Sequence, residues 1–469
     1  MEFEAVIGLE IHVEMKTKSK MFSSAPVSFG LAPNTQVDIF DMGFPGVMPV
    51  VNKQAVINAL RMCHALNMEI DDTITFERKN YYYSDLPKGY QITQEFRPLG
   101  KNGSLTIGNK TIVIERLHME EDTCKQLHYS DFTLLDYNRA GIPLLEIVSK
   151  PEITNGIEAA QFVEKIRSIV TYLGVSDGKM ERGSIRCDVN ISLKEKGTSK
   201  FGTKVEIKNL NSISNIEKAL DYEIARQSNL LEKGGVIKQE TRRFDEAKKQ
   251  TVSMRAKQDK VDYKFFTDPN IAPIKLSEIF IAEAINSSPE LAESKVNRYK
   301  ALGLSDYVSN LLVADKETSN YFDEGIKLGV NPKLFANWII GDIQSVLNKL
   351  DIDITQFMIS PSKMVELINL IECGKISNAQ AKEFFDEMLK NNISAKDLLK
   401  KNGELVSDED TLKEIVNEVL NSNEQTIVDY KNGKDKALGY LVGQVMKKTN
   451  GKANPVVVNK LITEELKRR

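Results

Sequence analysis

The chain has 469 residues, of which 41% are hydrophobic and 28% charged, and its formal net charge is −3. This length corresponds to about three domains of ordinary size, each able to bury its own core. No apolar run reaches the roughly 20 residues of a membrane-spanning helix, the first residues show no signal peptide, and the four cysteines form no CxxC pair. We therefore expect a cytoplasmic protein with reduced thiols and neither a disulfide framework nor a cysteine zinc site.

The stretch from Val6 to Met15 alternates apolar and polar residues, as a half-buried strand does. One face carries only apolar side chains, whereas the other carries Glu10, His12 and Glu14. Two carboxylates and an imidazole suit metal binding or proton transfer. Taken alone, however, the stretch fits a plain surface strand equally well.

Two later segments repeat this pattern of one apolar and one polar face, and a third ends an apolar strand with three consecutive acids. Their polar positions are Glu120, Glu121 and Asp122 at the end of an apolar strand, Arg186, Asp188 and Asn190 within residues 183–193, and Lys204, Glu206 and Lys208 within residues 203–209. If these faces share one antiparallel sheet, their carboxylates crowd together. Such crowding is unfavourable unless cations intervene.

Magnesium bound to a nucleotide is a cation source that fits this crowding. Mg²⁺ usually binds through one or two carboxylates together with phosphate oxygens, and nearby Lys or Arg side chains neutralise the phosphates. The sequence contains neither a P-loop nor a kinase-type glycine loop. The residues therefore favour a magnesium-dependent, phosphate-handling site on an antiparallel sheet, with a merely salt-bridged sheet as the alternative.

The chain divides into a strand-rich part and a helical part. Ten of the fourteen prolines precede residue 274, together with the glycine-rich turns, and the remainder reads as successive amphipathic helices. We place boundaries at residues 287–289 and 400–403, which gives domains of residues 1–288, 289–402 and 403–469. Residues 430–469 hold ten Lys or Arg against three Asp or Glu, so the last domain ends in a basic tail.

Seven segments carry a resemblance to a known family. They are residues 6–14 (VIGLEIHVE), 79–92, 118–122 (HMEED), 183–190 (GSIRCDVN), 204–212 (KVEIKNLNS), 240–246 (ETRRFDE) and 439–455 (GYLVGQVMKKTNGKANP). In this order they resemble the GatB/GatE family, the B subunits of the bacterial tRNA-dependent amidotransferase GatCAB. The resemblance spans almost the whole chain, and the order of the segments makes chance a negligible explanation.

This resemblance implies an α+β fold. A mainly antiparallel cradle domain resembling glutamine synthetase is followed by an all-α helical domain and a small all-α tail domain of the YqeY type. The implied activity is glutamine-dependent carbon–nitrogen ligation, with ATP and Mg²⁺ as cofactors: Glu-tRNA(Gln) or Asp-tRNA(Asn) is phosphorylated on its side-chain carboxylate and amidated. The implied partners are the glutaminase, or A, subunit and the small C subunit of a heterotrimer, and misacylated tRNA.

The resemblance also implies roles for individual residues. The implied metal ligands are Glu10, His12, Glu120, Glu121 and Glu206. The implied catalytic set is Glu10, His12, Lys79, Arg186, Asp188, Lys204, Glu206 and Lys208, in which Lys79, Arg186, Lys204 and Lys208 contact the nucleotide phosphates or the substrate. The implied tRNA-binding residues are Lys431, Lys434, Lys436, Lys447, Lys448 and Lys452.

Plainer interpretations stay open for some of these residues. Arg186 with Asp188, or Lys204 with Glu206, would alternatively form structural ion pairs, and the basic tail would alternatively be a solvated surface. Two other functions also stay open, a stand-alone amide ligase of the glutamine-synthetase type and a non-catalytic tRNA-binding scaffold. No Ser/His/Asp or Cys/His nucleophile arrangement stands out, so glutamine hydrolysis is expected of another chain.

One departure from the family concerns zinc. Many relatives carry CxC and CxxC pairs near the amino terminus, where this chain has Ser23, Ala25, Asp38 and Asp41. Structural zinc sites are built from thiolates and imidazoles. We therefore expect no zinc at these positions.

Overall fold

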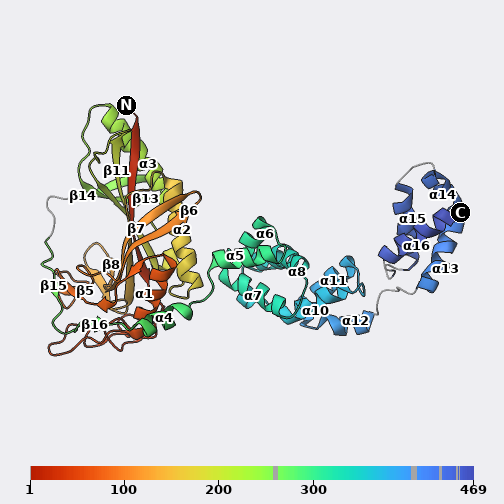
Figure 1. The fold of residues 1–469 in the computed structure, drawn as a ribbon, viewed down its shortest axis with the longest axis horizontal. Helices are drawn as coiled ribbons and strands as arrows, with labels where there is room; N and C mark the ends of the chain where they lie inside the picture. The colour runs from red at the N-terminus through yellow and green to blue at the C-terminus, as the bar shows by residue number, and fades with distance from the viewer. Residues whose placement is uncertain are drawn as a thin grey trace. The chain divides into compact units, whose positions relative to one another are not determined.

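The computed structural model describes residues 2–256, 262–402, 409–431, 436–449, 453 and 455–468. The contacts within the chain divide it into two compact units, Met1–Leu291 and Ala292–Arg469 (Figure 1). The boundary predicted at residues 400–403 reaches into residues 403–408, which lie outside the described residues. The division into three domains therefore stays a prediction.

A nine-stranded sheet forms the centre of the first unit. From one edge to the other its strands are β14 (Gln250–Ala256), β13 (Glu240–Asp245), β12 (Val205–Lys208), β11 (Ile185–Glu195), β1 (Phe3–Glu14), β10 (Pro143–Ser149), β7 (Lys110–Glu121), β6 (Gly100–Ile107) and β2 (Glu69–Ile70). Neighbouring strands are antiparallel except β12 and β13, which are parallel. The predicted α+β class with a mainly antiparallel sheet is thus confirmed.

Three helices cover the apolar face of this sheet. They are α1 (Lys53–Ala65), α2 (Gly156–Tyr172) and α3 (Ile213–Glu232), and Figure 1 shows them packed along the strands. Their side chains, such as Leu60 and Phe162, join the core formed by Ile7, Leu9 and Ile11 of β1. The alternation of β1 then leaves Glu10, His12 and Glu14 on the opposite face of the sheet.

Each of these helices begins at a side chain that caps its free backbone N–H groups. The side chains of Asn52, Asn155 and Ser212 accept hydrogen bonds from the first turns of α1, α2 and α3. Asn and Ser are strongly preferred at this position because they satisfy donors that the helix itself cannot pair. The helix starts are therefore fixed locally, which fixes where each helix lies on the sheet.

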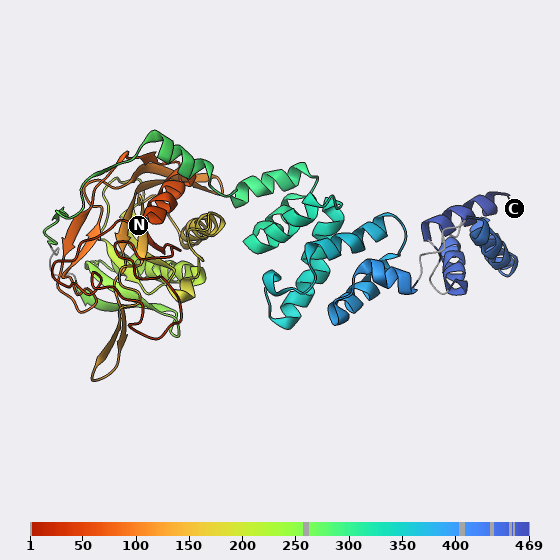
Figure 2. The same cartoon turned by 90° about the horizontal axis from the view of Figure 1, so that it is seen from below.

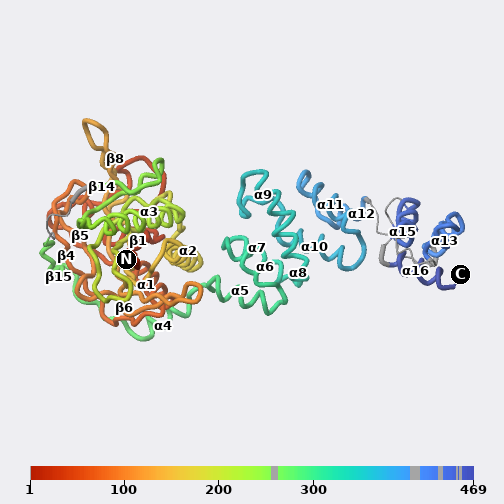
Figure 3. The backbone as a smooth tube through the Cα atoms, turned by 90° about the horizontal axis from the view of Figure 1, so that it is seen from above, coloured from red at the N-terminus to blue at the C-terminus, as the bar shows by residue number. Residues whose placement is uncertain are grey.

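Smaller elements complete the first unit. One three-stranded sheet holds β15 (Phe266–Thr267), β4 (Glu77–Asn80) and β5 (Tyr90–Thr93), and β16 (Ile274–Lys275) pairs with β3 (Thr73–Ile74). A short 3₁₀ turn, Met180–Arg182, precedes β11, and helix α4 (Glu278–Asn286) packs on α1 through a hydrogen bond from Arg61 to the carbonyl of Ala284. The hairpin of β8 (Lys125–His128) and β9 (Thr133–Asp136) stands out from the body of the unit (Figures 2 and 3).

The segment that contains Ser23, Ala25, Asp38 and Asp41 is held by a buried ion pair. Nζ of Lys20 lies 3.0 Å from Oδ2 of Asp41, and both side chains are at most 1% exposed. The same oxygen accepts hydrogen bonds from the hydroxyl of Ser23 and the backbone N–H of Asp38. The carboxylate of Asp41 therefore ties this stretch together.

Every secondary-structure element described in the second unit is a helix. Its helices are α5 (Ala292–Ala301), α6 (Asp306–Val313), α7 (Lys316–Lys327), α8 (Pro332–Trp338), α9 (Gln344–Leu350), α10 (Pro361–Glu372), α11 (Asn378–Asn391), α12 (Ala395–Asn402), α13 (Glu409–Asn421), α14 (Glu424–Lys431), α15 (Lys436–Lys448) and α16 (Pro455–Arg468). A π-helical turn, Ile339–Ile343, joins α8 to α9, and a 3₁₀ turn, Ile354–Gln356, precedes α10. None of the described helices is long and apolar enough to span a membrane.

Candidate active site

Strand register aligns four functional side chains across the sheet. Arg186 on β11 lies opposite His12 on β1, His12 lies opposite Glu146 on β10, and Glu146 lies opposite His118 on β7. Residues directly opposite in antiparallel strands share a face and have Cβ atoms about 5 Å apart. The polar face of β1 is thereby extended over four strands.

Carboxylates surround both imidazoles of this row. Nε2 of His12 lies 3.3 Å from Glu146, 3.7 Å from Glu10 and 3.8 Å from Glu120, in each case to a carboxylate oxygen. Nε2 of His118 lies 3.7 Å from carboxylate oxygens of both Glu120 and Glu146. The donor atoms form two overlapping groups, Glu10–His12–Glu146 and His118–Glu120–Glu146, in which they lie within 4.8 Å of one another.

The charges of this cluster shift the protonation of its members. Burial lowers the pKa of His12, but its hydrogen bond with Glu146 and the charges of the surrounding carboxylates raise that pKa to about 9. Burial and the nearby charge of Glu146 raise the pKa of Glu10. The pKa of Glu146 lies well below its usual range, because the two imidazoles and Arg116 outweigh its burial. Without a bound cation, the surrounding carboxylates therefore favour the protonated forms of His12 and Glu10.

The donor set fits a divalent cation. A hard cation such as Mg²⁺ or Mn²⁺ takes carboxylate oxygens, and with metal–ligand bonds of about 2.1 Å its octahedral ligands lie roughly 3 to 4.2 Å apart. The three distances from Nε2 of His12 to carboxylate oxygens fall in this range. Two of them, 3.7 and 3.8 Å, are too long for hydrogen bonds. Nδ1 of His118 is also buried without a hydrogen-bond partner among the described residues. The residues present thus fit a metal centre better than a closed ion-pair network.

One flank of this cluster carries a lysine between two acids. Asp188 on β11 lies opposite Glu10, and the ammonium group of Lys208 on β12 pairs closely with Asp188 and lies 3.4 Å from Glu206. Burial lowers the pKa of Lys208, but the charge of Asp188 raises it above its usual value. Lys208 therefore stays charged beside Glu10, where it is suited to bind an anion.

The other flank contains a second group of charges. The guanidinium group of Arg186 donates to Asp122 at 2.5 Å, and Arg139 lies 3.7 Å from the same carboxylate. Burial and the adjacent Asp122 raise the pKa of Glu14 to about 8. Arg186 thus pairs with Asp122, and not with Asp188 as the plainer interpretation of the sequence had it.

The implied site residues Glu121 and Lys79 are not brought to this cluster. Glu120 and Glu121 are consecutive on β7, so they face opposite sides of the sheet. The carboxylate of Glu121 is buried against Lys88 at 2.5 Å and accepts a hydrogen bond from the backbone N–H of Ile92. Lys79 lies on β4 in the three-stranded sheet, with its ammonium group 5.0 Å from the ring centre of Tyr263.

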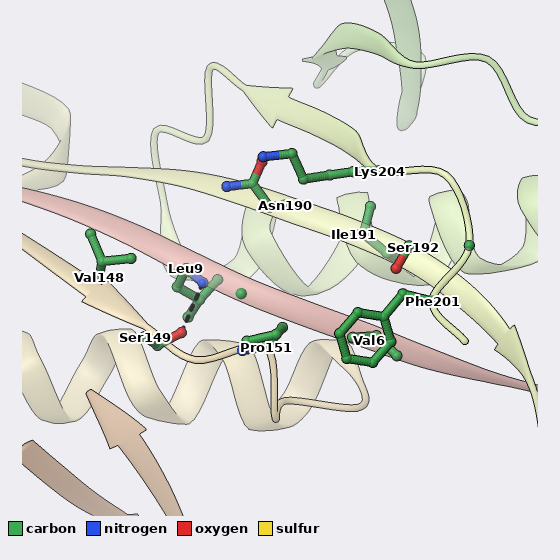
Figure 4. Close-up of a pocket in the computed structure, with 12 residues that line it drawn as sticks. Val6, Leu9, Val148, Ser149, Pro151, Asn190, Ile191, Ser192, Phe201 and Lys204 are labelled. Atoms are coloured by element: carbon green, nitrogen blue, oxygen red, sulfur yellow. Dashed lines mark hydrogen bonds between the residues drawn. The ribbon is translucent and has the colours of Figure 1, made fainter. Parts of the chain in front are cut away.

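Lys204 lies beside a pocket that begins where the acidic cluster ends. The pocket has a volume of about 270 Å³, and Figure 4 shows the side chains around it. Gly8 and Asn190 form part of its wall, two residues along β1 and β11 from Glu10 and Asp188. A methyl group added at Gly8 would make ordinary van der Waals contacts of 3.7 Å with Pro151 and the carbonyl of Ser149, and it would occupy part of the pocket.

Sequence reasoning missed three residues of the cluster as site residues: His118, Asp122 and Glu146. His118 and Asp122 belong to the HMEED segment, but only its two glutamates were given a role. Glu146 is the single acid within the apolar run from Ile142 to Val148, and it is 7% exposed. A lone carboxylate in a buried strand demands a partner, which is a signal that the sequence alone contains.

The structure describes the predicted tRNA-binding lysines only in part. Lys434 and Lys452 lie outside the described residues, and the backbone places Lys431 at the end of α14 and Lys436 at the start of α15. Lys447 and Lys448 end α15, and the ammonium group of Lys448 lies 2.5 Å from Glu418. Whether these side chains bind tRNA stays a prediction.

The fold and the site define a class of protein. An antiparallel sheet that presents carboxylates and imidazoles, flanked by Lys and Arg, is suited to a metal-dependent reaction of an anionic substrate. Comparison with known proteins gives the family: residues 5–282 match the GatB/GatE catalytic domain and residues 320–466 match the GatB domain.

Relatives match over the entire chain. It is 46% identical, over all of its own length and all of theirs, to the B subunits of the aspartyl/glutamyl-tRNA(Asn/Gln) amidotransferases of Bacillus thuringiensis (strain Al Hakam), Bacillus cereus (strain AH820) and Bacillus cytotoxicus. The chain belongs to the GatB/GatE family. The resemblance drawn from its seven segments is thereby confirmed.

Proposed function

We propose that this chain is the component of a tRNA-dependent amidotransferase that activates the misacylated amino acid. It uses ATP to phosphorylate the side-chain carboxylate of Glu-tRNA(Gln) or Asp-tRNA(Asn), and ammonia from a separate glutaminase then displaces the phosphate. The single observation that carries this proposal is the convergence of Glu10, His12, Glu120 and Glu146 on one face of a sheet whose family is established. The name of the relatives, which are B subunits of an amidotransferase, gives the class of reaction.

The chemistry explains why such a site is needed. A carboxylate is a poor electrophile, because its negative charge repels nucleophiles and oxide is a poor leaving group. Phosphorylation converts the oxygen into a leaving group, and phosphoryl transfer depends mainly on positioning and on neutralising the charge of the moving group. Preorganised positive groups beside the acids are therefore the feature to look for.

The residues divide this work between them. Glu10, His12, Glu120 and Glu146 would hold Mg²⁺, which when bound neutralises phosphate oxygens. Lys208, held by Asp188, would bind the phosphate from one flank, and Arg186, held by Asp122, would orient the substrate carboxylate from the other. The pocket lined by Gly8 and Lys204 adjoins the acidic cluster and would take part of the nucleotide.

The remaining expectations belong to the same proposal. The first unit would be a cradle related to glutamine synthetase, and the basic end of the second unit would be a YqeY-like tail that contacts tRNA. The complex would be a cytoplasmic heterotrimer that also contains a glutaminase, the A subunit, and a small C subunit. As an enzyme it would be a glutamine-dependent carbon–nitrogen ligase that uses ATP and Mg²⁺ and needs no zinc.

One assay tests the proposal against its alternatives. ATP hydrolysis and amide formation are measured with Mg²⁺ while misacylated tRNA, free glutamate and the partner subunits are added or omitted. We expect both reactions to require Glu-tRNA(Gln) or Asp-tRNA(Asn), with ammonium chloride able to replace glutamine. Amidation of free glutamate without tRNA would indicate a small-molecule ligase instead. Binding of tRNA without any nucleotide-dependent reaction would indicate a scaffold.

A further inference from the structure

The hairpin of β8 and β9 exposes its apolar face, which is unusual for an element on a free surface. Leu127 lies opposite Leu134, and Tyr129 and Phe132 continue the same face at the tip. These four side chains are 42%, 50%, 55% and 56% exposed, in the order Leu127, Leu134, Tyr129, Phe132. Soluble proteins normally turn the apolar face of such an alternating hairpin toward a core.

The exposed face has contacts within itself, and the opposite face of the hairpin is polar. The rings of Tyr129 and Phe132 stack with their centres 4.8 Å apart, and a backbone hydrogen bond closes the turn between them. On the opposite face His128 pairs with the hydroxyl of Thr133, and Gln126 donates to Ser84 of the body. The hairpin is therefore amphipathic, with its polar side satisfied and its apolar side bare. A contiguous exposed apolar patch of this kind marks an interaction surface.

Charge decides what kind of partner fits this face. Residues 125–136 contain one lysine, no arginine and two aspartates, so the hairpin offers no cluster of positive charge to a phosphate backbone. Aromatic side chains surrounded by few charges are typical of the centre of a protein–protein interface. A polypeptide with an apolar docking surface is the occupant that this composition favours.

The position of the hairpin connects it to the candidate active site. It is inserted between β7, which carries His118 and Glu120, and β10, which carries Glu146. Arg139 holds its base by donating to the carbonyls of Thr123 and Cys124. The hairpin thus joins the sheet beside the group of Glu14, Asp122 and Arg186, whereas the pocket at Gly8 lies about 20 Å away along β1, six residues from Glu14.

We propose that the apolar face of this hairpin is the docking surface for the glutaminase subunit of the amidotransferase. The inference rests on the proposed function, which requires a second chain to supply ammonia. A partner held here lies at the end of the site opposite the pocket assigned to the nucleotide. Ammonia would then reach the phosphorylated carboxylate from the Glu14 end, and ATP would occupy the Gly8 end.

The test compares two matched double variants of the full-length chain. Tyr129→Ser with Phe132→Ser removes the apolar face, and Gln126→Ser with His128→Ser changes the polar face of the same hairpin. Binding of each to the purified glutaminase subunit, together with the small subunit, is measured by biolayer interferometry. We expect the first variant to bind at least about tenfold more weakly than the second, because exposed aromatic residues dominate such interfaces.

A second measurement separates docking from chemistry. With ammonium chloride as the nitrogen source, both variants are expected to amidate misacylated tRNA at the parent rate. Equal binding of both variants to the glutaminase subunit would overturn the docking proposal. So would a loss of tRNA affinity or of self-association as the only defect of the Tyr129/Phe132 variant. Failure of the parent chain to use ammonium would instead count against the proposed function, and the binding comparison would still decide the docking surface.

Discussion

The two units of the molecule each bury a cluster of charges, and the two clusters differ in balance. In the second unit, the carboxylate of Asp323 on α7 lies 2.9 Å from the guanidinium group of Arg298 and 2.9 Å from the ammonium group of Lys295. It also accepts a hydrogen bond from the hydroxyl of Tyr299. Each of these contacts has the length of a good charged hydrogen bond. In the first unit, three carboxylates face two imidazoles across distances of 3.3 to 3.8 Å.

We interpret this difference as one between a structural cluster and a functional cluster. The Asp323 cluster is complete by itself, since cations and a hydroxyl surround a single carboxylate. The His12 cluster has excess acid, loose contacts and a buried imidazole nitrogen without a partner among the described residues. Natural sequences retain such locally unfavourable arrangements chiefly at functional sites. The following predictions test whether the two clusters differ as this interpretation requires.

The largest expected effect is on catalysis. His12→Ala and Glu146→Gln should each lower the rate of ammonium-dependent transamidation by about 10² to 10³ fold, since each removes a proposed ligand of the Mg²⁺ that would neutralise phosphate oxygens. Steady-state kinetics on misacylated tRNA measures this. The control is Glu115→Gln, an exposed acid on β7. Parent rates in both site variants would show that the cluster is not the active site.

Breaking the balanced cluster should cost stability and leave the chemistry intact. Asp323→Asn removes the carboxylate that pairs with the buried Lys295 and the partly exposed Arg298, and should lower the free energy of unfolding by about 2 to 3 kcal/mol. Denaturant titration measures this, with the exposed pair of Asp306 and Lys300 as the control, where Asp306→Asn should cost at most about 1 kcal/mol. A cost for Asp323→Asn no larger than that of the control would contradict this assignment.

The same cluster predicts a pH dependence of stability. Burial raises the pKa of Asp323, but Arg298 and Lys295 lower it below its usual value. An acid whose pKa is lower in the folded than in the unfolded state contributes stability that is complete above its unfolded pKa and is lost as pH falls through its folded pKa. The parent should therefore lose stability below about pH 4 more steeply than Asp323→Asn. Stability that falls equally steeply with pH in the parent and in Asp323→Asn would contradict this prediction.

The acidic cluster predicts the opposite response to neutralisation. Burial and Glu146 raise the pKa of Glu10, so its charged form is unfavourable in the absence of a cation. Glu10→Gln should therefore stabilise the metal-free protein by about 0.5 to 1 kcal/mol, while thermal stabilisation by added Mg²⁺ shrinks. Calorimetry with and without MgCl₂ measures both. A destabilised variant with an undiminished Mg²⁺ response would place the metal elsewhere.

The smallest effect concerns the basic tail. Reversing Lys447 to Glu should weaken tRNA binding and flatten its salt dependence by about 0.7 to 0.9 in the log–log slope for each phosphate interaction removed. Lys448 already pairs with Glu418, so its reversal should matter less than that of Lys447. Lys396→Glu on α12 carries the same charge change outside the tail and serves as the control. Unchanged affinity at 50 and 200 mM salt would remove the tail from the tRNA interface.

Most of the sheet face was accessible from the sequence because alternation has a simple geometric meaning. Glu10, His12 and Asp188 follow from strands with a strict period of two, and antiparallel neighbours bring such faces together. The same rule separates Glu120 from Glu121, so only one of two consecutive acids reaches the cluster. Glu146 was harder, because β10 is buried on both faces and its apolar run shows no alternation.

The helical part shows the complementary limit. Amphipathic periodicity predicted helices after residue 288, and every secondary-structure element described in the second unit is a helix. Which buried lysine meets which aspartate depends on how α5 packs on α7, and periodicity contains no information on that packing. In the sequence, Lys295 and Asp323 look like ordinary charged residues on helices. Only the three-dimensional structure shows that they form a cluster.

Glu146 lies on the middle strand of the three that supply the donor atoms, and it is the one carboxylate common to both of their groups. A change at position 10 would alter mainly the environment of His12, but a change at position 146 disturbs both imidazoles at once. Both groups of donor atoms therefore depend on Glu146. Substitutions at the edge of the cluster can be accommodated one at a time. At residue 146, shortening the side chain by a single methylene group would move the carboxylate away from two histidines at once.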